Sequence, residues 1–172
     1  MLHLHLVFDF LANAMSDCVG CLIVAWIISQ YPQNIDPLKA LQSQITLQLC
    51  NLIAAFDSFA ENDKLTSSSS SFGIIDVSYK MDALSITILG KALGVIAKYW
   101  IPEMIGAIEC LIYHMNDQLT AEGCAKGLIA VAMLDEGRKF LKSEKILNLL
   151  YNIGNSNLGI YVKPIISIIQ YS

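Results

Sequence analysis

Apolar residues recur at helical spacing through most of the chain. In the clearest case Asp36 is a good N-cap, and Pro37 suits the first helical position, where its missing N–H costs nothing. Apolar residues then recur at intervals of three, four and seven, which predicts a helix to about Ala60 and excludes a strand. Comparable patterns predict helices over about 2–30, 81–99, 102–116, 120–132 and 143–154, and a last helix that begins near Pro164.

Two short segments interrupt this pattern. Residues 61–73, ENDKLTSSSSSFG, predict a loop, because the five serines at 67–71 have nothing to bury. Residues 74–77 are the only credible strand, and one strand makes no sheet. The sequence therefore predicts an all-α protein of one domain over 1–172, either an irregular helical bundle or a short α-solenoid of about six to seven helices.

Four glycines lie inside predicted helices at a spacing of four residues. They are Gly90 and Gly94 in one helix and Gly123 and Gly127 in another. Each interior glycine costs about 1 kcal/mol of helix stability relative to alanine. We expect close approach of a neighbouring helix backbone to compensate for this cost.

The chain has few charges for its size. Of 172 residues, 55% are hydrophobic and 15% are charged, where an ordinary globular chain has about 25% charged residues. Either the core is unusually large, or a partner or a membrane covers part of the surface. The densest apolar run, 18–29, is shorter than the roughly 20 residues that span a bilayer, which favours a buried core helix. Lipid contact by residues 7–29, and by 84–112 with its four charges, is the alternative.

The balance of charges and the cysteines bear on which partners and which compartment we expect. The net charge is −4 and Arg138 is the only arginine, so no basic stripe is present for nucleic acid. The cysteine count, five, is odd, and each cysteine lies in an apolar helical run, which predicts reduced, buried thiols. The first ten residues, MLHLHLVFDF, have no basic region and no cleavage site typical of a secretory signal. We therefore expect a cytoplasmic, or at least intracellular, protein.

Candidate chemistry is sparse. Cys18 and Cys21, with His3 and His5, supply the residue types of a zinc site, but inert core cysteines are the favoured interpretation. Cys110 and His114, one helical turn apart, permit a nucleophile–base pair without a visible orienting residue.

The remaining sequence contains no phosphate-binding, dinucleotide-binding, serine-hydrolase or metalloprotease motif. We expect no catalytic residue, no metal and no cofactor.

Aromatic residues near the predicted helix ends are the candidate partner-binding residues, because Tyr and Trp are common at interfaces. They are Trp26, Tyr99, Trp100, Tyr113, Tyr151 and Tyr161.

Two stretches, 92–115 and 149–170, share one order of features: an apolar helix end, a turn with Gly or Asn, an aromatic residue, a proline and an Ile-rich helix. In these features about a third of the chain resembles the HEAT and armadillo families of helical repeats. The residues that carry the resemblance are Leu93, Gly94, Ile96, Pro102 and Ile105, and then Leu150, Ile153, Gly154, Pro164 and Ile165. The prolines lie further apart than one repeat of about 40 residues. The resemblance implies stacked helix pairs and a protein-binding surface.

These observations favour a non-catalytic protein–protein interaction or scaffold module in a larger intracellular assembly, with a protein partner or self-association. A membrane-associated helical subunit is the alternative. A weaker alternative is a small-molecule-binding protein or an enzyme that uses Cys110 and His114.

Overall fold

The predicted all-α class is confirmed. The computed structural model describes residues 11, 13–15, 18–66 and 74–171, with the side chains of 57–82 left out. Within these residues there is no strand, and the nine α-helices exceed the expected six to seven. The helices are α2 (Cys18–Gln30), α3 (Pro37–Gln42), α4 (Ile45–Thr66), α5 (Ile74–Ile96), α6 (Met104–His114), α7 (Ala121–Ala132), α8 (Asp135–Leu141), α9 (Glu144–Gly154) and α10 (Gly159–Tyr171), with a short 3₁₀ turn, η1 (Pro32–Asn34).

The helix predicted from Pro37 to about Ala60 is two helices. Its start is as expected, because the Asp36 carboxylate accepts a hydrogen bond of 3.0 Å from the backbone N–H of Leu38. The chain then breaks after α3, where Gln44 has a φ of 60°, in the left-handed region that ends a right-handed helix. Apolar spacing continues across this break, so the periodicity does not reveal it.

The strand suggested for 74–77 is wrong, because this segment is the first turn of α5. Without a second strand, its backbone N–H and C=O groups find partners only inside a helix. The loop predicted for 61–73 is also too long at its start, because α4 continues to Thr66. The serines at 67–71 lie outside the described residues.

The charged group around residues 135–139 forms a short helix of its own, α8. Asp135 and Glu136 lie in its first turn, and Arg138 and Lys139 lie in its last turn. This order places each charge at the helix end whose dipole it complements.

The last helix begins five residues earlier than predicted, and Pro164 lies inside it. A proline there removes the hydrogen bond to the carbonyl four residues before, that of Ile160. Both Pro164 and Ile160 are exposed, so water can reach this carbonyl. Exposure is what makes the interior proline tolerable.

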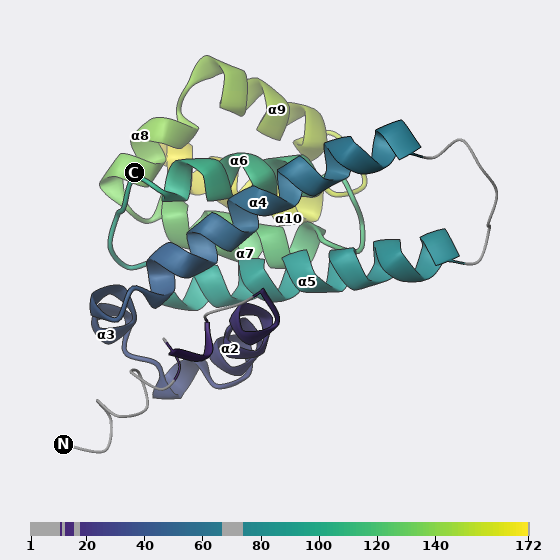
Figure 1. Cartoon of the computed structure of the whole chain (residues 1–172). Helices are drawn as coiled ribbons and strands as arrows, with labels where there is room; N and C mark the ends of the chain where they lie inside the picture. Colours follow the sequence, from purple (N-terminus) through teal and green to yellow (C-terminus); the bar gives the residue numbers. More distant parts are fainter. Residues whose placement is uncertain (1–10, 12, 16–17, 67–73, 172) are drawn as a thin grey trace.

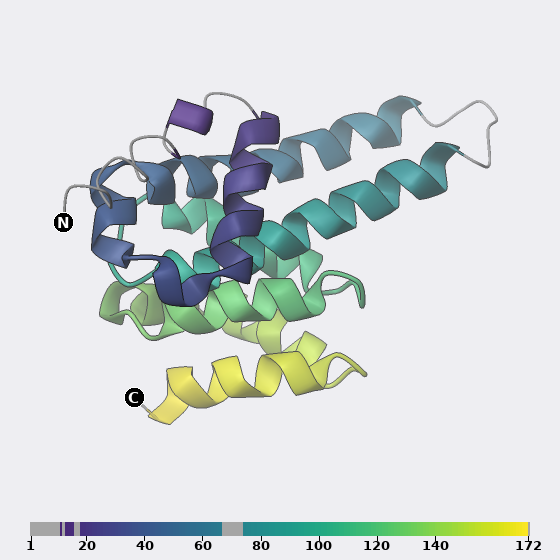
Figure 2. The same cartoon turned by 90° about the horizontal axis from the view of Figure 1, so that it is seen from below.

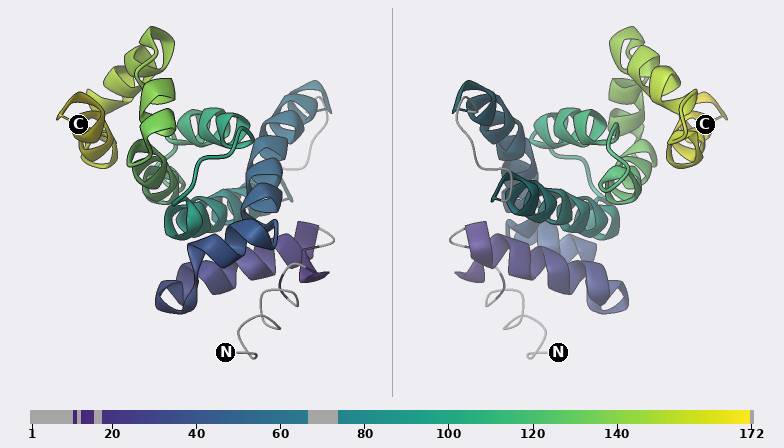
Figure 3. Two further views of the ribbon diagram at one scale, coloured as in Figure 1. Left: turned by 90° about the vertical axis from the view of Figure 1, so that its left-hand side faces the viewer. Right: turned by 90° about the vertical axis from the view of Figure 1, so that its right-hand side faces the viewer.

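The helices pack in a chain of neighbours that runs from one end of the molecule to the other. In one layer α5 packs on α7 and α7 packs on α10 (Figure 1). On the other side α4 packs on α5 and α6, α6 packs on α7, and α9 packs on α10. At one end α2 crosses α5 at a steep angle (Figure 2), and at the opposite end lie α9 and α10 (Figure 3). The buried side chains form one hydrophobic core through these layers.

The interior glycines of α5 and α7 lie where these two helices approach each other closely. A Cβ added at Gly90 would lie 2.5 Å from the carbonyl oxygen of Gly123, and one at Gly123 would lie 2.5 Å from that of Thr87. A Cβ at Gly94 would lie 2.9 Å from the carbonyl oxygen of Lys126. The expected backbone approach is therefore confirmed, and it joins α5 to α7.

The turn between α6 and α7 is closed by a buried hydroxyl. Thr120 stands at the N-cap position of α7, but its side chain does not cap that helix. Its hydroxyl instead donates to the carbonyl of His114 and lies 3.3 Å from that of Asp117. The side chain is 1% exposed, so water cannot replace this donor.

We expect Thr120→Val to lower the free energy of unfolding by about 1 kcal/mol, because valine keeps the shape and loses the hydrogen bond. Thr120→Ser, which keeps the hydroxyl, is the matched control and should lose less. Urea unfolding of the three proteins measures the difference. Equal stability of the wild type and the valine variant would contradict this role.

Candidate binding surface

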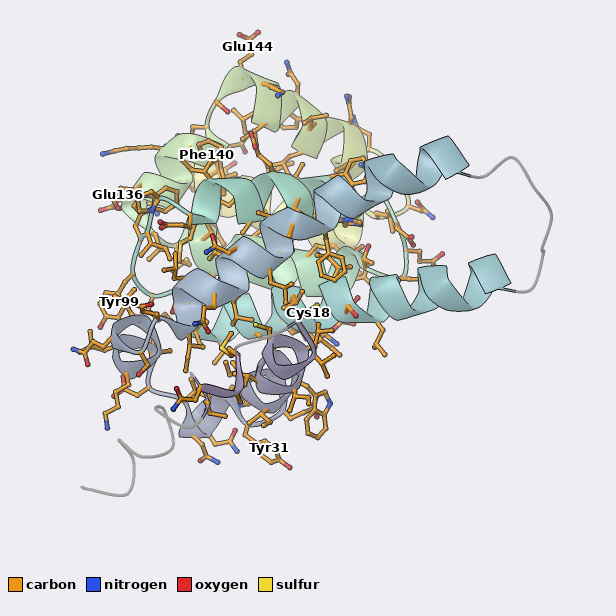
Figure 4. All side chains as sticks on the ribbon, viewed as in Figure 1. Cys18, Tyr31, Tyr99, Glu136, Phe140 and Glu144 are labelled. Atoms are coloured by element: carbon orange, nitrogen blue, oxygen red, sulfur yellow. The ribbon has the colours of Figure 1, made fainter. Side chains whose placement is uncertain are left out.

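The six aromatic candidates do not form one surface. Trp26, Tyr99, Tyr113 and Tyr151 are exposed, whereas Trp100 and Tyr161 are half-buried against the core. Trp26 belongs to α2 and Tyr151 to α9, at opposite ends of the molecule (Figure 3). Tyr99 lies in the turn between α5 and α6, and Figure 4 draws it well apart from Glu144 at the start of α9.

One exposed apolar feature of the described residues is a face of α2, which we call the α2 ridge. It consists of Val19, Ile23 and Trp26, which are 66%, 53% and 48% exposed. Their spacing of four and three residues places them on one side of the helix. The opposite side, with Val24, Ala25 and Ile28, is buried against the core. The helix contains no charged residue.

The sequence predicted a buried core helix here, and half of that prediction is wrong. A helix that is apolar on all sides normally lies inside a protein or a membrane. In the structure α2 lies at one end of the molecule, and of the described helices α5 and α4 pack on its buried side. Val19 and Ile23 were missed as surface residues because nothing in a uniformly apolar helix indicates which face points outward.

A second surface feature is a shallow groove of about 260 Å³ at the other end of the molecule, between α9 and α10. We call it the α9–α10 groove, and its lining is Tyr151, Gly154, Asn155, Lys163, Ile166, Ser167, Gln170 and Tyr171. The Gln170 amide donates a hydrogen bond to the Tyr151 hydroxyl, which ties the end of α10 to α9. Lys163 is the only charged residue in the lining. Of the predicted partner-binding residues, only Tyr151 belongs to this groove.

The cysteine pair considered as half of a zinc site is divided between surface and interior. Cys18 is exposed, which contradicts the prediction that all five cysteines are buried, and Cys21 is buried. The Cys21 thiol donates to the carbonyl of Met15 at 3.4 Å. His3 and His5 lie outside the described residues. Across the residues that the structure does describe, no three His, Cys, Asp or Glu side chains gather as a metal site.

Cys110 and His114 lie on successive turns of α6, as the sequence suggests, but in different surroundings. The Cys110 side chain is completely buried in the core, so a substrate cannot reach its thiol. The His114 ring is partly buried and packs edge-on against Tyr113, with the ring centroids 5.2 Å apart. This arrangement does not favour a nucleophile–base pair.

Two other buried thiols are held in the protonated form. Burial raises the pKa of Cys50 to about 12, with a further contribution from the negative charge of Glu103. Burial likewise raises the pKa of Cys124 to about 12. Because the thiolate is the nucleophile, neither cysteine reacts readily at neutral pH.

We expect one thiol to react rapidly with a water-soluble thiol reagent in the folded protein, and the other four to react only on unfolding. The rapid one is Cys18, the single exposed cysteine. Cys18→Ser should abolish the rapid phase, and Cys50→Ser, at a buried site, should leave it unchanged. Mass spectrometry of the labelled protein identifies the site. A rapid phase that survives in Cys18→Ser would contradict the burial of the other thiols.

The α2 end of the molecule differs from its middle in charge. At the middle, Glu122 of α7 pairs with Lys126 at 2.8 Å and with Lys91 of α5 at 3.8 Å. The hydrogen bond and charge of Lys126, with that of Lys91, lower the pKa of the Glu122 carboxyl. Exposed pairs of this kind add little stability. The α2 ridge, by contrast, lies on a helix without any charge.

No helix in the described part of the chain is both long enough and apolar enough to cross a membrane. The α2 helix has 13 residues, and the stretch 84–112 is divided between α5 and α6. Comparison with known proteins adds no relative: no protein-family model matches the chain, and neither the curated proteins nor the solved structures give a significant match.

Proposed function

We propose that this chain is a non-catalytic protein–protein interaction module that works inside a larger intracellular assembly. The observation that carries the proposal is the α2 ridge, where Val19, Ile23 and Trp26 expose a continuous apolar face. Burial of such a face gains roughly 25 cal/mol per Å² of apolar surface, and a tryptophan is the residue most often decisive at an interface.

The packing of the helices also supports this proposal. The pairs α4–α5, α6–α7 and α9–α10 follow one another along the molecule, with each pair packed on the next through α5, α7 and α10. Of the two stretches that resemble HEAT and armadillo repeats, 149–170 covers one such packed pair, α9–α10, whereas 92–115 covers the end of α5 and α6, which contact each other little. Such stacked pairs present extended surfaces to protein partners.

Contact with a membrane surface is the less favoured function. A helix that lies in the lipid interface normally carries Lys and Arg on its polar face. The α2 helix carries no charge at all, and its inward face is buried against α5. A protein surface therefore suits the α2 ridge better than a lipid headgroup layer does.

Affinity purification of the tagged chain from its native cells, followed by mass spectrometry, tests the proposal. Ile23→Lys places a charge in the centre of the α2 ridge, and Met133→Lys, at an exposed apolar residue outside it, is the matched control. We expect specific proteins to copurify with the wild type and the control, and to be lost with Ile23→Lys. The same proteins in all three samples would overturn the assignment of the interface, and the absence from every sample of both other proteins and untagged copies of this chain would overturn the proposed function.

A further inference from the structure

We propose that the α2 ridge of one copy of this chain docks into the α9–α10 groove of a second copy. This inference rests on the proposed function and names the partner of the α2 ridge. The two features lie at opposite ends of the molecule, so a single copy cannot join them (Figures 2 and 3). A second copy can, and the contact is then head-to-tail.

The size of the groove fits one side chain better than a free ligand. Its volume of about 260 Å³ lies below the roughly 300–1,000 Å³ of most small-molecule sites. Its lining is mainly apolar surface, to which Ile166, Gly154 and the tyrosine rings contribute. The largest side chain of the α2 ridge is Trp26, which stands 48% exposed.

The polar groups of the groove match what a docked tryptophan requires. An indole N–H that leaves water needs a hydrogen-bond acceptor. Four residues of the lining carry a hydroxyl or amide oxygen in their side chains: Tyr151, Asn155, Ser167 and Gln170. The groove therefore offers both an apolar surface and an acceptor.

The partial charge at the C-terminal end of α2 and the charge of the α9–α10 groove are also opposite in sign. The C-terminal end of a helix carries partial negative charge, which a nearby cation stabilises. The α2 helix has no basic residue in its last turn, and Trp26 lies next to that turn. Lys163, the only charged residue of the groove, supplies this cation when Trp26 of a second copy docks.

Head-to-tail contacts leave one free ridge and one free groove at the two ends of any open assembly. Such contacts extend into chains or close into rings, unlike the self-complementary contact of a two-fold dimer. We therefore expect the purified wild-type chain to form species larger than a dimer as its concentration rises.

Sedimentation velocity of the purified full-length chain over a wide concentration range tests the inference. Trp26→Ala removes the docking side chain, and Ser167→Glu places a negative charge in the groove, against the negative end of α2. Each variant alone should weaken self-association by about tenfold or more, as loss of a central tryptophan does at many interfaces. Met133→Glu, a charge outside both surfaces, should associate as the wild type does. Circular dichroism checks that all variants fold.

Mixing the two variants gives the decisive result. The Trp26→Ala copy keeps an intact groove, and the Ser167→Glu copy keeps an intact ridge, so the mixture should form a one-to-one dimer that cannot extend. A monomeric wild type at every concentration would overturn the inference. So would a Ser167→Glu variant that associates normally while Trp26→Ala does not, because the ridge would then pair with itself.

Flotation with vesicles of neutral and acidic lipids tests whether the α2 ridge binds a lipid surface instead. Trp26-dependent binding of a monomeric chain to vesicles would overturn the inference in favour of a lipid surface. If the purified chain is monomeric while Ile23→Lys still loses a different protein in the native cell, the inference fails and the proposed function stands.

Discussion

Alanine at Gly123 is expected to destabilise the protein by about 2 kcal/mol or more. The new Cβ would lie 2.5 Å from the carbonyl oxygen of Thr87 and 2.6 Å from its Cα, so α5 and α7 must move apart. Overpacking of this kind costs about 3 kcal/mol, from which the better helix propensity of alanine subtracts about 1 kcal/mol. The atoms in the way belong to the backbone, so a rotamer change cannot relieve the clash.

The other glycines provide a graded series with an internal control. Gly90→Ala should cost about as much, because its Cβ would lie 2.5 Å from the carbonyl oxygen of Gly123. Gly127→Ala should cost less, because its nearest neighbour is the Leu111 side chain, which can move. Gly154→Ala is the control, with its nearest neighbour at an ordinary 3.6 Å, and should be neutral or slightly stabilising.

Urea unfolding of the four variants tests the series, with the slope of the transition checked for a constant value. A stability order unrelated to the distances would contradict the close contact of α5 and α7. In particular, Gly123→Ala as stable as Gly154→Ala would show that the two helices do not approach through these glycines.

Leu111→Ala is expected to cost about 2–5 kcal/mol, the range for truncating a completely buried leucine. Leu111 has no exposed surface and lies in the core on α6. Its Cδ1 packs over Gly127 of α7, where an added Cβ would approach it to 2.9 Å. Truncation therefore leaves a cavity at the contact between two helices that cannot close in on it freely.

Ile105→Ala on the same helix is the matched control. Ile105 is exposed, so its truncation removes little buried surface and should cost less than half as much. Thermal and urea unfolding of both variants give the comparison. Equal losses for the two variants would contradict the placement of Leu111 in the core and Ile105 on the surface.

Local signals in the sequence were reliable where the structure is decided locally. Asp36 and Pro37 marked the start of a helix because the cap bond joins residues two apart. The break at Gln44 left no such mark, since apolar spacing runs through it and only the packing of α3 and α4 requires a turn there.

The predicted binding residues show the limit of local reasoning. The preference of Tyr and Trp for interfaces indicated six positions, of which four are exposed and two are half-buried. Exposure depends on which face of a helix meets its neighbours. The pattern of apolar and polar residues indicates that face only in an amphipathic helix. The α2 helix is apolar on every side, so Val19 and Ile23 could be recognised as surface residues only from the fold.

The sequence by itself determined that this protein is all-α, because period-3.6 apolar spacing and local caps act within a few residues of chain. It also indicated that a neighbouring helix backbone lies against the interior glycines, since glycines at a spacing of four are costly without one, but not that the two helices concerned are α5 and α7. Only the tertiary structure decided that α2 lies at one end with a bare apolar face and that α9 and α10 leave a groove at the other. Those surfaces depend on which helices lack a neighbour, and that is a property of the whole packing.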